Sequence, residues 1–235
     1  WVDDIMNVKA EYPINMNRYD GVTPEAIIRT INDMYSNLIV TTDVGQNQLW
    51  TTQYIDIDEN KQLLTSGGLG TMGYGFPAAI GAKIGNMDKD VICISGDGGV
   101  QMNIQEMATA VALELPVTLC ILNNGYLGNV RQWQELFFNK RYSSTCLRYR
   151  RRCNRDCQNP DKCCPKYSPD FVKLAESYDA KGIRVTKPEE IRPAFEAARA
   201  NTNGPTVIEF FIDPTANVFP MVPGGKSLND MILDC

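Results

Sequence analysis

The 235-residue sequence contains no histidine and no excess of basic residues. Without histidine, acid–base catalysis by imidazole and metal sites built on imidazole are excluded within this chain. No apolar run approaches the roughly 18 residues of a membrane-spanning helix, and no signal or transit peptide is visible, so no membrane partner is expected. A net charge of −5 argues against a nucleic-acid partner. The 43% hydrophobic and 22% charged residues are ordinary for a globular protein, and the length suits one α/β domain.

Two apolar, β-branched runs at residues 91–95 and 117–122 bracket a segment with the apolar spacing of a helix. A strand, a helix and a strand in this order form a right-handed unit with parallel strands. The polar turns that follow the two runs, GDGG at 96–99 and NNG at 123–125, therefore emerge at the same carboxyl edge of the sheet. Ligands bind at that edge in open α/β sheets.

These two turns carry the residue types that hold a diphosphate through a divalent cation. Asp97 offers a carboxylate and Asn124 an amide oxygen, and Mg²⁺ prefers such hard oxygen ligands together with phosphate oxygens. Gly98 and Gly99 would let a diphosphate approach the backbone N–H groups at the start of the next helix. Glycine and asparagine are common in any turn. Their separation, with each turn directly after a buried-strand pattern, is nevertheless similar to the motif of thiamine-diphosphate enzymes.

The rest of the chain alternates between helix and strand patterns. A helix is expected after Thr23 as its N-cap, and others at 76–84, 169–178 and 188–200. Further strands are expected at 38–42, 182–185 and 206–211. This alternation predicts a doubly wound, mostly parallel α/β sheet with helices on both faces. Residues 1–20 read as a linker from an upstream domain, and residues 21–235 as one domain.

Several longer segments resemble the catalytic large subunit of acetolactate synthases, also called acetohydroxyacid synthases. They are VGQNQLW at 44–50, GGLGTMGYGFPAAIGA at 67–82, QMNIQEMATA at 101–110, LNNGYLGNVRQWQELFF at 122–138 and VFPMVPGGKSLNDMI at 218–232. The resemblance covers nearly the whole chain except residues 146–165. It implies the C-terminal domain of that enzyme, which binds the diphosphate of thiamine diphosphate (ThDP) with Mg²⁺.

The resemblance also implies the reaction. In this family, pyruvate loses CO₂ and its remaining two-carbon unit adds to a second 2-oxo acid. Pyruvate as acceptor gives acetolactate, and 2-oxobutyrate gives acetohydroxybutyrate, in branched-chain amino-acid biosynthesis. The substrates would be small 2-oxo acids, and the location would be cytoplasmic, in a bacterium.

Site residues follow from the family motifs, position by position. The expected cofactor-binding residues are Gly45, Gln46, Asn47, Gly70, Met72, Gly96, Asp97, Gly98, Gly99, Asn124 and Tyr126. Of these, Asp97, Asn124 and the backbone carbonyl of Tyr126 would bind the metal, and Met72 would lie as a wedge under the cofactor. The expected substrate-contacting residues are Asn129, Val130 and Trp133.

This sequence departs from the family pattern at two of these positions. Asn47 stands where the family usually has histidine, and its amide could donate a hydrogen bond to phosphate but carries no charge. Asn129 stands where the family usually has methionine, which puts part of the apolar substrate wall in doubt. Trp133, the family's residue for favouring the larger acceptor, is retained.

Essential parts of the resembled enzyme are expected outside this chain. The activating glutamate belongs to a separate pyrimidine-binding domain of a partner subunit, and FAD binds a further domain. No catalytic side chain is therefore expected here, and the isolated domain should be inactive. The full-length enzyme would be a homodimer through the ThDP site, with a possible regulatory small subunit.

Residues 146–165 form a basic, cysteine-rich insertion. Its five cysteines are Cys146, Cys153, Cys157, Cys163 and Cys164. The segment is too polar for core burial, so zinc, an iron–sulfur cluster or disulfides could cross-link it. A solvated loop with reduced thiols is the alternative. Cys93 and Cys120, in contrast, fall in strand patterns and are expected in the core.

Three other functions remain open on sequence alone. The chain could belong to another ThDP enzyme, such as a 2-oxo acid decarboxylase or pyruvate oxidase. It could be the ThDP chain of a 2-oxo acid:ferredoxin oxidoreductase, which also pairs ThDP with cysteines. It could also be a non-catalytic metal-binding interaction module with the cysteine loop as its working surface.

Overall fold

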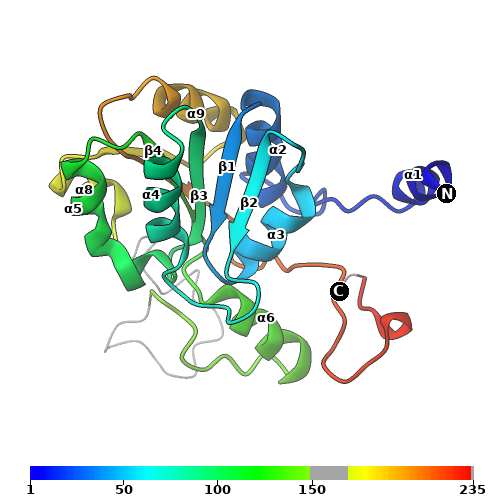
Figure 1. Ribbon diagram of the computed structural model, residues 1–235. Coiled ribbons are helices and arrows are strands. Elements are labelled where there is room, and N and C mark those ends of the chain that lie inside the picture. The colour runs from blue at the N-terminus through cyan, green and yellow to red at the C-terminus, as the bar shows by residue number, and fades with distance from the viewer. Residues whose placement is uncertain (149–168, 234–235) are drawn as a thin grey trace.

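A six-stranded parallel sheet forms the centre of the computed structural model, which describes residues 1–148 and 169–233 (Figure 1). The strands lie in the order β2-β1-β3-β4-β6-β5, and each neighbouring pair is parallel. Their bounds are β1 Leu38–Thr42, β2 Lys61–Thr65, β3 Asp90–Gly96, β4 Val117–Asn123, β5 Lys181–Val185 and β6 Thr206–Phe211. The predicted parallel α/β sheet is confirmed.

Helices cover both faces of this sheet. One layer contains α2 (Pro24–Met34), α3 (Gln46–Tyr54) and α9 (Ile191–Arg199). The opposite layer contains α4 (Gly75–Gly85), α5 (Met107–Ala112) and α8 (Phe171–Ser177). The other helical segments are α1 (Val2–Glu11), α6 (Gly128–Phe137) and the short 3₁₀ segments η1 (Val100–Glu106), η2 (Pro188–Glu190) and η3 (Leu228–Asp230). Within the described ranges, no helix has the length and apolarity needed to cross a membrane.

Two hydrophobic cores lie on opposite faces of the sheet because successive strand side chains alternate in direction. In β3, Ile92 and Ile94 pack in the core beneath α2, α3 and α9, whereas Val91 and Cys93 pack in the other. Strands buried on both faces need continuous apolar runs, which is why β3 and β4 were recognisable from sequence. Cys93 and Cys120 are fully buried in these cores, as predicted.

Besides the short 3₁₀ segment η3, four elements of the structure were not predicted. Helix α1 lies within the range expected as a linker; it has no buried residue and stands apart from the sheet (Figure 1). Strand β2 is an edge strand with partly exposed residues, so its apolar run is short. Helix α3 buries the polar residues Gln46, Asn47 and Thr51, and the two buried residues of α6, Arg131 and Gln132, are also polar, so neither helix buries a purely apolar face. The linker role of residues 1–20 stays a prediction.

The helix predicted between β3 and β4 is instead divided into two parts. The 3₁₀ segment η1 precedes the short α5, and Asn103 within η1 is non-helical, with φ −133°. The side-chain amide of Asn103 donates to the carbonyl of Gly73 at 2.8 Å. This hydrogen bond joins the segment after β3 to the glycine-rich loop before α4.

The strand order creates a crevice at the carboxyl ends of the central strands. From β1 the chain passes to β2 on one side, and it later places β3 on the other side of β1. The connections after β1 and β3 therefore diverge, and such a switch point is where open α/β sheets bind ligands. The turns after β1, β3 and β4 all open into this crevice.

Candidate functional site

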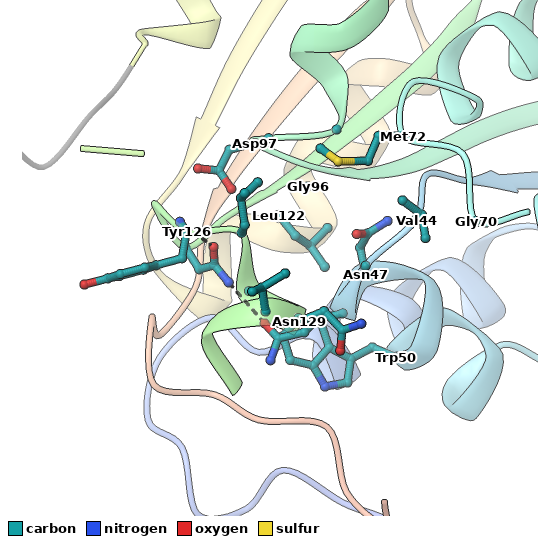
Figure 2. A pocket seen from close by; sticks show the side chains of 18 of the residues that line it. Val44, Asn47, Trp50, Gly70, Met72, Gly96, Asp97, Leu122, Tyr126 and Asn129 are labelled. Carbon is teal, nitrogen blue, oxygen red and sulfur yellow. Dashed lines mark hydrogen bonds between the residues drawn. The ribbon is translucent and has the colours of Figure 1, made fainter. Parts of the chain in front are cut away.

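A cavity of about 250 Å³ lies at the carboxyl ends of β1, β3 and β4 (Figure 2). Every residue predicted to bind the cofactor, its metal or a substrate lines it. These residues are Gly45, Gln46, Asn47, Gly70, Met72, Gly96, Asp97, Gly98, Gly99, Asn124, Tyr126, Asn129, Val130 and Trp133. The structure thus brings together segments from four regions of the chain. What each residue binds stays a prediction.

Asp97 is the most unusual polar residue of the cavity. It directly follows β3 and is 1% exposed, yet neither of its carboxylate oxygens has a hydrogen-bond partner among the residues that the structure describes. Burial raises the pKa of this carboxyl from 3.8 to about 7, although the nearby backbone N–H groups of Asp97 and Gly125 and the charge of Arg148 oppose the shift. A buried carboxylate without a partner is costly. A divalent cation at this position would compensate its charge.

The two glycines that follow Asp97 also lie close to other side chains of the protein. A Cβ atom on Gly98 would lie 2.7 Å from Leu127 Cδ2. A Cβ atom on Gly99 would overlap the carboxylate of Asp43. Glycine at these positions thus leaves room for the protein's own side chains as well as for a ligand.

Asp43 is a buried residue at the end of β1 that was not predicted as part of the site. Its carboxylate accepts hydrogen bonds from the backbone N–H groups of Val44, Gly73 and Gly75, at 3.0–3.1 Å. Burial raises the pKa of this carboxyl, although these hydrogen bonds oppose the shift. Asp43 therefore fixes the glycine-rich loop that carries Gly70 and Met72. Its sequence signal, an acidic residue directly after a buried strand, is the same as that of Asp97.

Asn47 joins the ends of two strands. Its side-chain NH₂ group donates to the carbonyls of Asp43, at 2.7 Å, and Ile94, at 3.1 Å. Both of its amide hydrogens are thus used within the protein. The hydrogen bond from Asn47 to a phosphate that we expected would require one of these contacts to break.

One part of the cavity is apolar and more exposed. Met72, Val130 and Trp133 are 37%, 40% and 45% exposed, and the last two belong to α6. Figure 2 shows Met72 near Asp97 at one end of the cavity and Trp50 at the other. The cavity therefore combines polar strand ends with an open apolar wall, as a site for a large cofactor and a small substrate requires.

The cysteine-rich insertion begins beside this cavity. Cys146 forms an isolated antiparallel bridge with Tyr126, and the flanking hydrogen bonds are Leu127 N–H to Thr145 carbonyl and Leu147 N–H to Gly125 carbonyl, both 2.9 Å. The thiol of Cys146 is free. The other four cysteines of the insertion lie outside the described residues. Their cross-linking, by metal or disulfide, stays a prediction.

Several further residues of the site were not predicted to contact a ligand, although most of them lie in the motif segments at 44–50 and 122–138. Val44, Trp50, Leu122, Leu127 and Gly128 also line the cavity. Arg148 is 9% exposed and lies 5.5 Å from the centre of the Tyr126 ring. In the sequence it belonged to the basic run of the insertion. In the part of the chain that the structure describes, no group of three or more His, Cys, Asp or Glu residues could hold a metal.

Comparisons with known proteins agree with this geometry. The family model of the thiamine pyrophosphate enzyme C-terminal TPP-binding domain matches residues 43–210. The acetolactate synthase large subunit of Corynebacterium glutamicum is 42% identical over 98% of this chain and 35% of its own length. A probable acetolactate synthase large subunit of Methanococcus aeolicus is 40% identical over 99% of this chain and 37% of its length.

A third relative is similar over a comparable part of its length. The acetolactate synthase isozyme 2 large subunit of Escherichia coli is 37% identical over 91% of this chain and 36% of its own length. The chain thus spans little more than a third of the curated relatives that it matches.

Proposed function

Since the chain belongs to the family of C-terminal TPP-binding domains of thiamine pyrophosphate enzymes, we propose that it is this domain of an acetolactate synthase large subunit. The observation that carries the proposal is the cavity in which the acidic turn after β3 meets the Asn124 turn and the apolar face of α6. The names of the relatives favour this function over the other ThDP enzymes and the interaction module considered above.

The residues at the polar end of the cavity fit a cation-bound diphosphate. Asp97 supplies a buried carboxylate with no hydrogen-bond partner among the described residues, and Asn124 supplies a neighbouring amide oxygen. With the backbone carbonyl of Tyr126, they would hold Mg²⁺, which prefers oxygen ligands and phosphate. Thiamine diphosphate, when bound, supplies a centre that stabilises a carbanion.

The chain's own residues bind and orient the reactants. Gly45 with the start of α3, together with the turn at residues 96–99, would hold the diphosphate, and Met72 would support the thiamine from the glycine-rich loop. Val130 and Trp133, half-exposed on α6, would form an apolar wall against the acceptor 2-oxo acid and exclude water from it. Asn129 makes this wall more polar than a methionine would.

The complete reaction joins two small 2-oxo acids with loss of CO₂. It would give acetolactate from pyruvate alone, and acetohydroxybutyrate when 2-oxobutyrate is the acceptor. The activating glutamate and the FAD site would belong to other parts of the enzyme. A homodimer would complete the ThDP site, a small subunit would regulate it, and a biosynthetic enzyme of this kind would work in the cytoplasm.

Product analysis of the full-length enzyme tests this proposal. Purified enzyme supplied with ThDP, Mg²⁺, FAD and pyruvate should form acetolactate and CO₂, and omission of either ThDP or Mg²⁺ should abolish product. Acetaldehyde or acetyl phosphate in place of acetolactate would assign the chain to another ThDP enzyme.

A further inference from the structure

Three buried side-chain amides form a hydrogen-bonded chain behind the cavity. The NH₂ group of Asn124 donates to Gln46 Oε1 at 3.2 Å, and the NH₂ group of Gln46 donates to Gln132 Oε1 at 3.0 Å. Gln132 then pairs with the backbone of Val218: its NH₂ group donates to the carbonyl at 2.8 Å, and its oxygen accepts from the N–H at 2.9 Å. These amides, Asn124, Gln46 and Gln132, are called the amide chain below.

The backbone at one end of the amide chain determines the orientation of every member. A peptide N–H can only donate, so Val218 requires the oxygen of Gln132 to face it. That oxygen also faces Gln46, which must present its NH₂ group. The carbonyl of Ala216 can only accept a hydrogen bond and lies 3.0 Å from Gln46 Nε2, so it also requires the NH₂ group of Gln46 on this side. The oxygen of Gln46 is then left to accept, and Asn124 must present its NH₂ group.

The consequence is that the amide oxygen of Asn124 is turned away from Gln46. It accepts from the N–H of Tyr126 at 2.9 Å, and its second lone pair remains for another partner. An Asn124 amide rotated by 180° would place two oxygens, its own and that of Gln46, against each other. In a buried site such a contact is costly.

The surroundings leave this arrangement little freedom. Asn124, Gln46 and Gln132 are 8%, 4% and 1% exposed. Gly128 lies against the first contact of the chain, where a Cβ atom would overlap Gln46 Oε1 and lie 2.7 Å from Asn124 Nδ2. Water therefore cannot readily replace a lost partner.

We propose that Gln132 and Gln46 are positioning residues that hold the Asn124 amide with its oxygen toward the bound cation. Through them, the orientation of a cation ligand after β4 depends on the backbone of residues 216–218, far away in the sequence. This inference rests on the proposed function, because it assumes that Asn124 is a ligand of Mg²⁺.

The Mg²⁺ concentration that half-saturates ThDP binding tests the inference. Trp50 and Trp133 line the cavity, so tryptophan fluorescence of the full-length enzyme can follow a Mg²⁺ titration at fixed ThDP. Gln132→Leu removes both contacts with Val218 and one of the two acceptors of Gln46. Because a neutral hydrogen bond is worth a factor of about 2–10, half-saturation should need about fivefold more Mg²⁺.

Gln53→Leu is the matched control. Gln53 also donates to the carboxyl-terminal segment, to the carbonyl of Phe219 at 3.0 Å, and this hydrogen bond does not involve the amide chain. This variant should change half-saturation by less than about twofold. If Gln132→Leu does not fold, Gln132→Met, which keeps the side-chain length, takes its place in the titration.

The outcomes separate the inference from the proposed function. An unchanged Mg²⁺ requirement in the Gln132 variants, or an equal increase in Gln53→Leu, would overturn the role of the amide chain while the enzyme still binds ThDP. Wild-type enzyme that binds no ThDP at any Mg²⁺ concentration would overturn the proposed function, and the inference with it.

Discussion

Replacing Asp97 by asparagine should make the stability of the metal-free chain less sensitive to a rise from acidic to neutral pH. Burial raises the pKa of Asp97 from 3.8 to about 7, so the folded chain holds this proton more tightly than the unfolded chain. Folding stability is therefore lost as the pH rises through the range between these two values. An amide at this position does not titrate, and the loss should disappear.

The expected size follows from the shift. At about 1.4 kcal/mol per pKa unit, the roughly three units correspond to a loss of about 4 kcal/mol in the free energy of unfolding. Between pH 5 and pH 8 the wild type crosses about two of these units, or roughly 3 kcal/mol. The free energy of unfolding of Asp97→Asn, relative to that of the wild type, should therefore rise by that amount between pH 5 and pH 8. Any constant cost of burying the amide cancels in this comparison.

Urea unfolding at pH 5 and pH 8 with a chelator present measures this difference. Asp56→Asn is the control, because its side chain is exposed. Added Mg²⁺ at pH 8 should then stabilise wild type and not Asp97→Asn. If wild type and Asp97→Asn differ in stability by the same amount at pH 5 and at pH 8, Asp97 does not carry an uncompensated buried charge in the metal-free chain.

Three further predictions concern the cavity wall and the insertion. Gly99→Ala should destabilise the chain by about 1–3 kcal/mol in thermal or urea unfolding, because its Cβ atom would overlap the Asp43 carboxylate; Gly81→Ala in α4, which meets no atom within 4 Å, should not. Trp133→Leu in the full-length enzyme should keep acetolactate formation but lose about 1–3 kcal/mol of preference for 2-oxobutyrate in competition assays, and an unaltered product ratio would reduce Trp133 to a packing residue. Elemental analysis and thiol counting on anaerobically prepared protein should show a metal or at least one disulfide within the segment 146–164. Metal-free protein with all eight thiols free would instead support the solvated loop.

The central strands were predictable because both of their faces are covered, and the partly exposed edge strand β5 was also predicted, at residues 182–185. β3 and β4 are buried along almost their whole length and so read as unbroken apolar runs. β2, at the sheet edge, has alternating exposure and only a short apolar pair, Leu63 and Leu64, which the sequence pattern did not distinguish from a loop.

The site was predictable where its residues follow those strands directly. Asp97 and Asn124 come after β3 and β4, and parallel pairing brings both to one edge. The buried positions of Gln46 and Gln132 were not predictable, because their partners lie far away in the sequence. A polar residue on a helix is usually exposed, and only the tertiary structure shows that Gln132 satisfies a buried backbone segment.

Calorimetric titration of ThDP into the full-length enzyme tests the central claim most directly. The account predicts binding that requires Mg²⁺ in the wild type and is mostly lost in Asp97→Ala, because the diphosphate charge is then poorly compensated. ThDP affinity that is the same without Mg²⁺, or the same in Asp97→Ala, would contradict the assignment of this cavity as a cation-dependent diphosphate site.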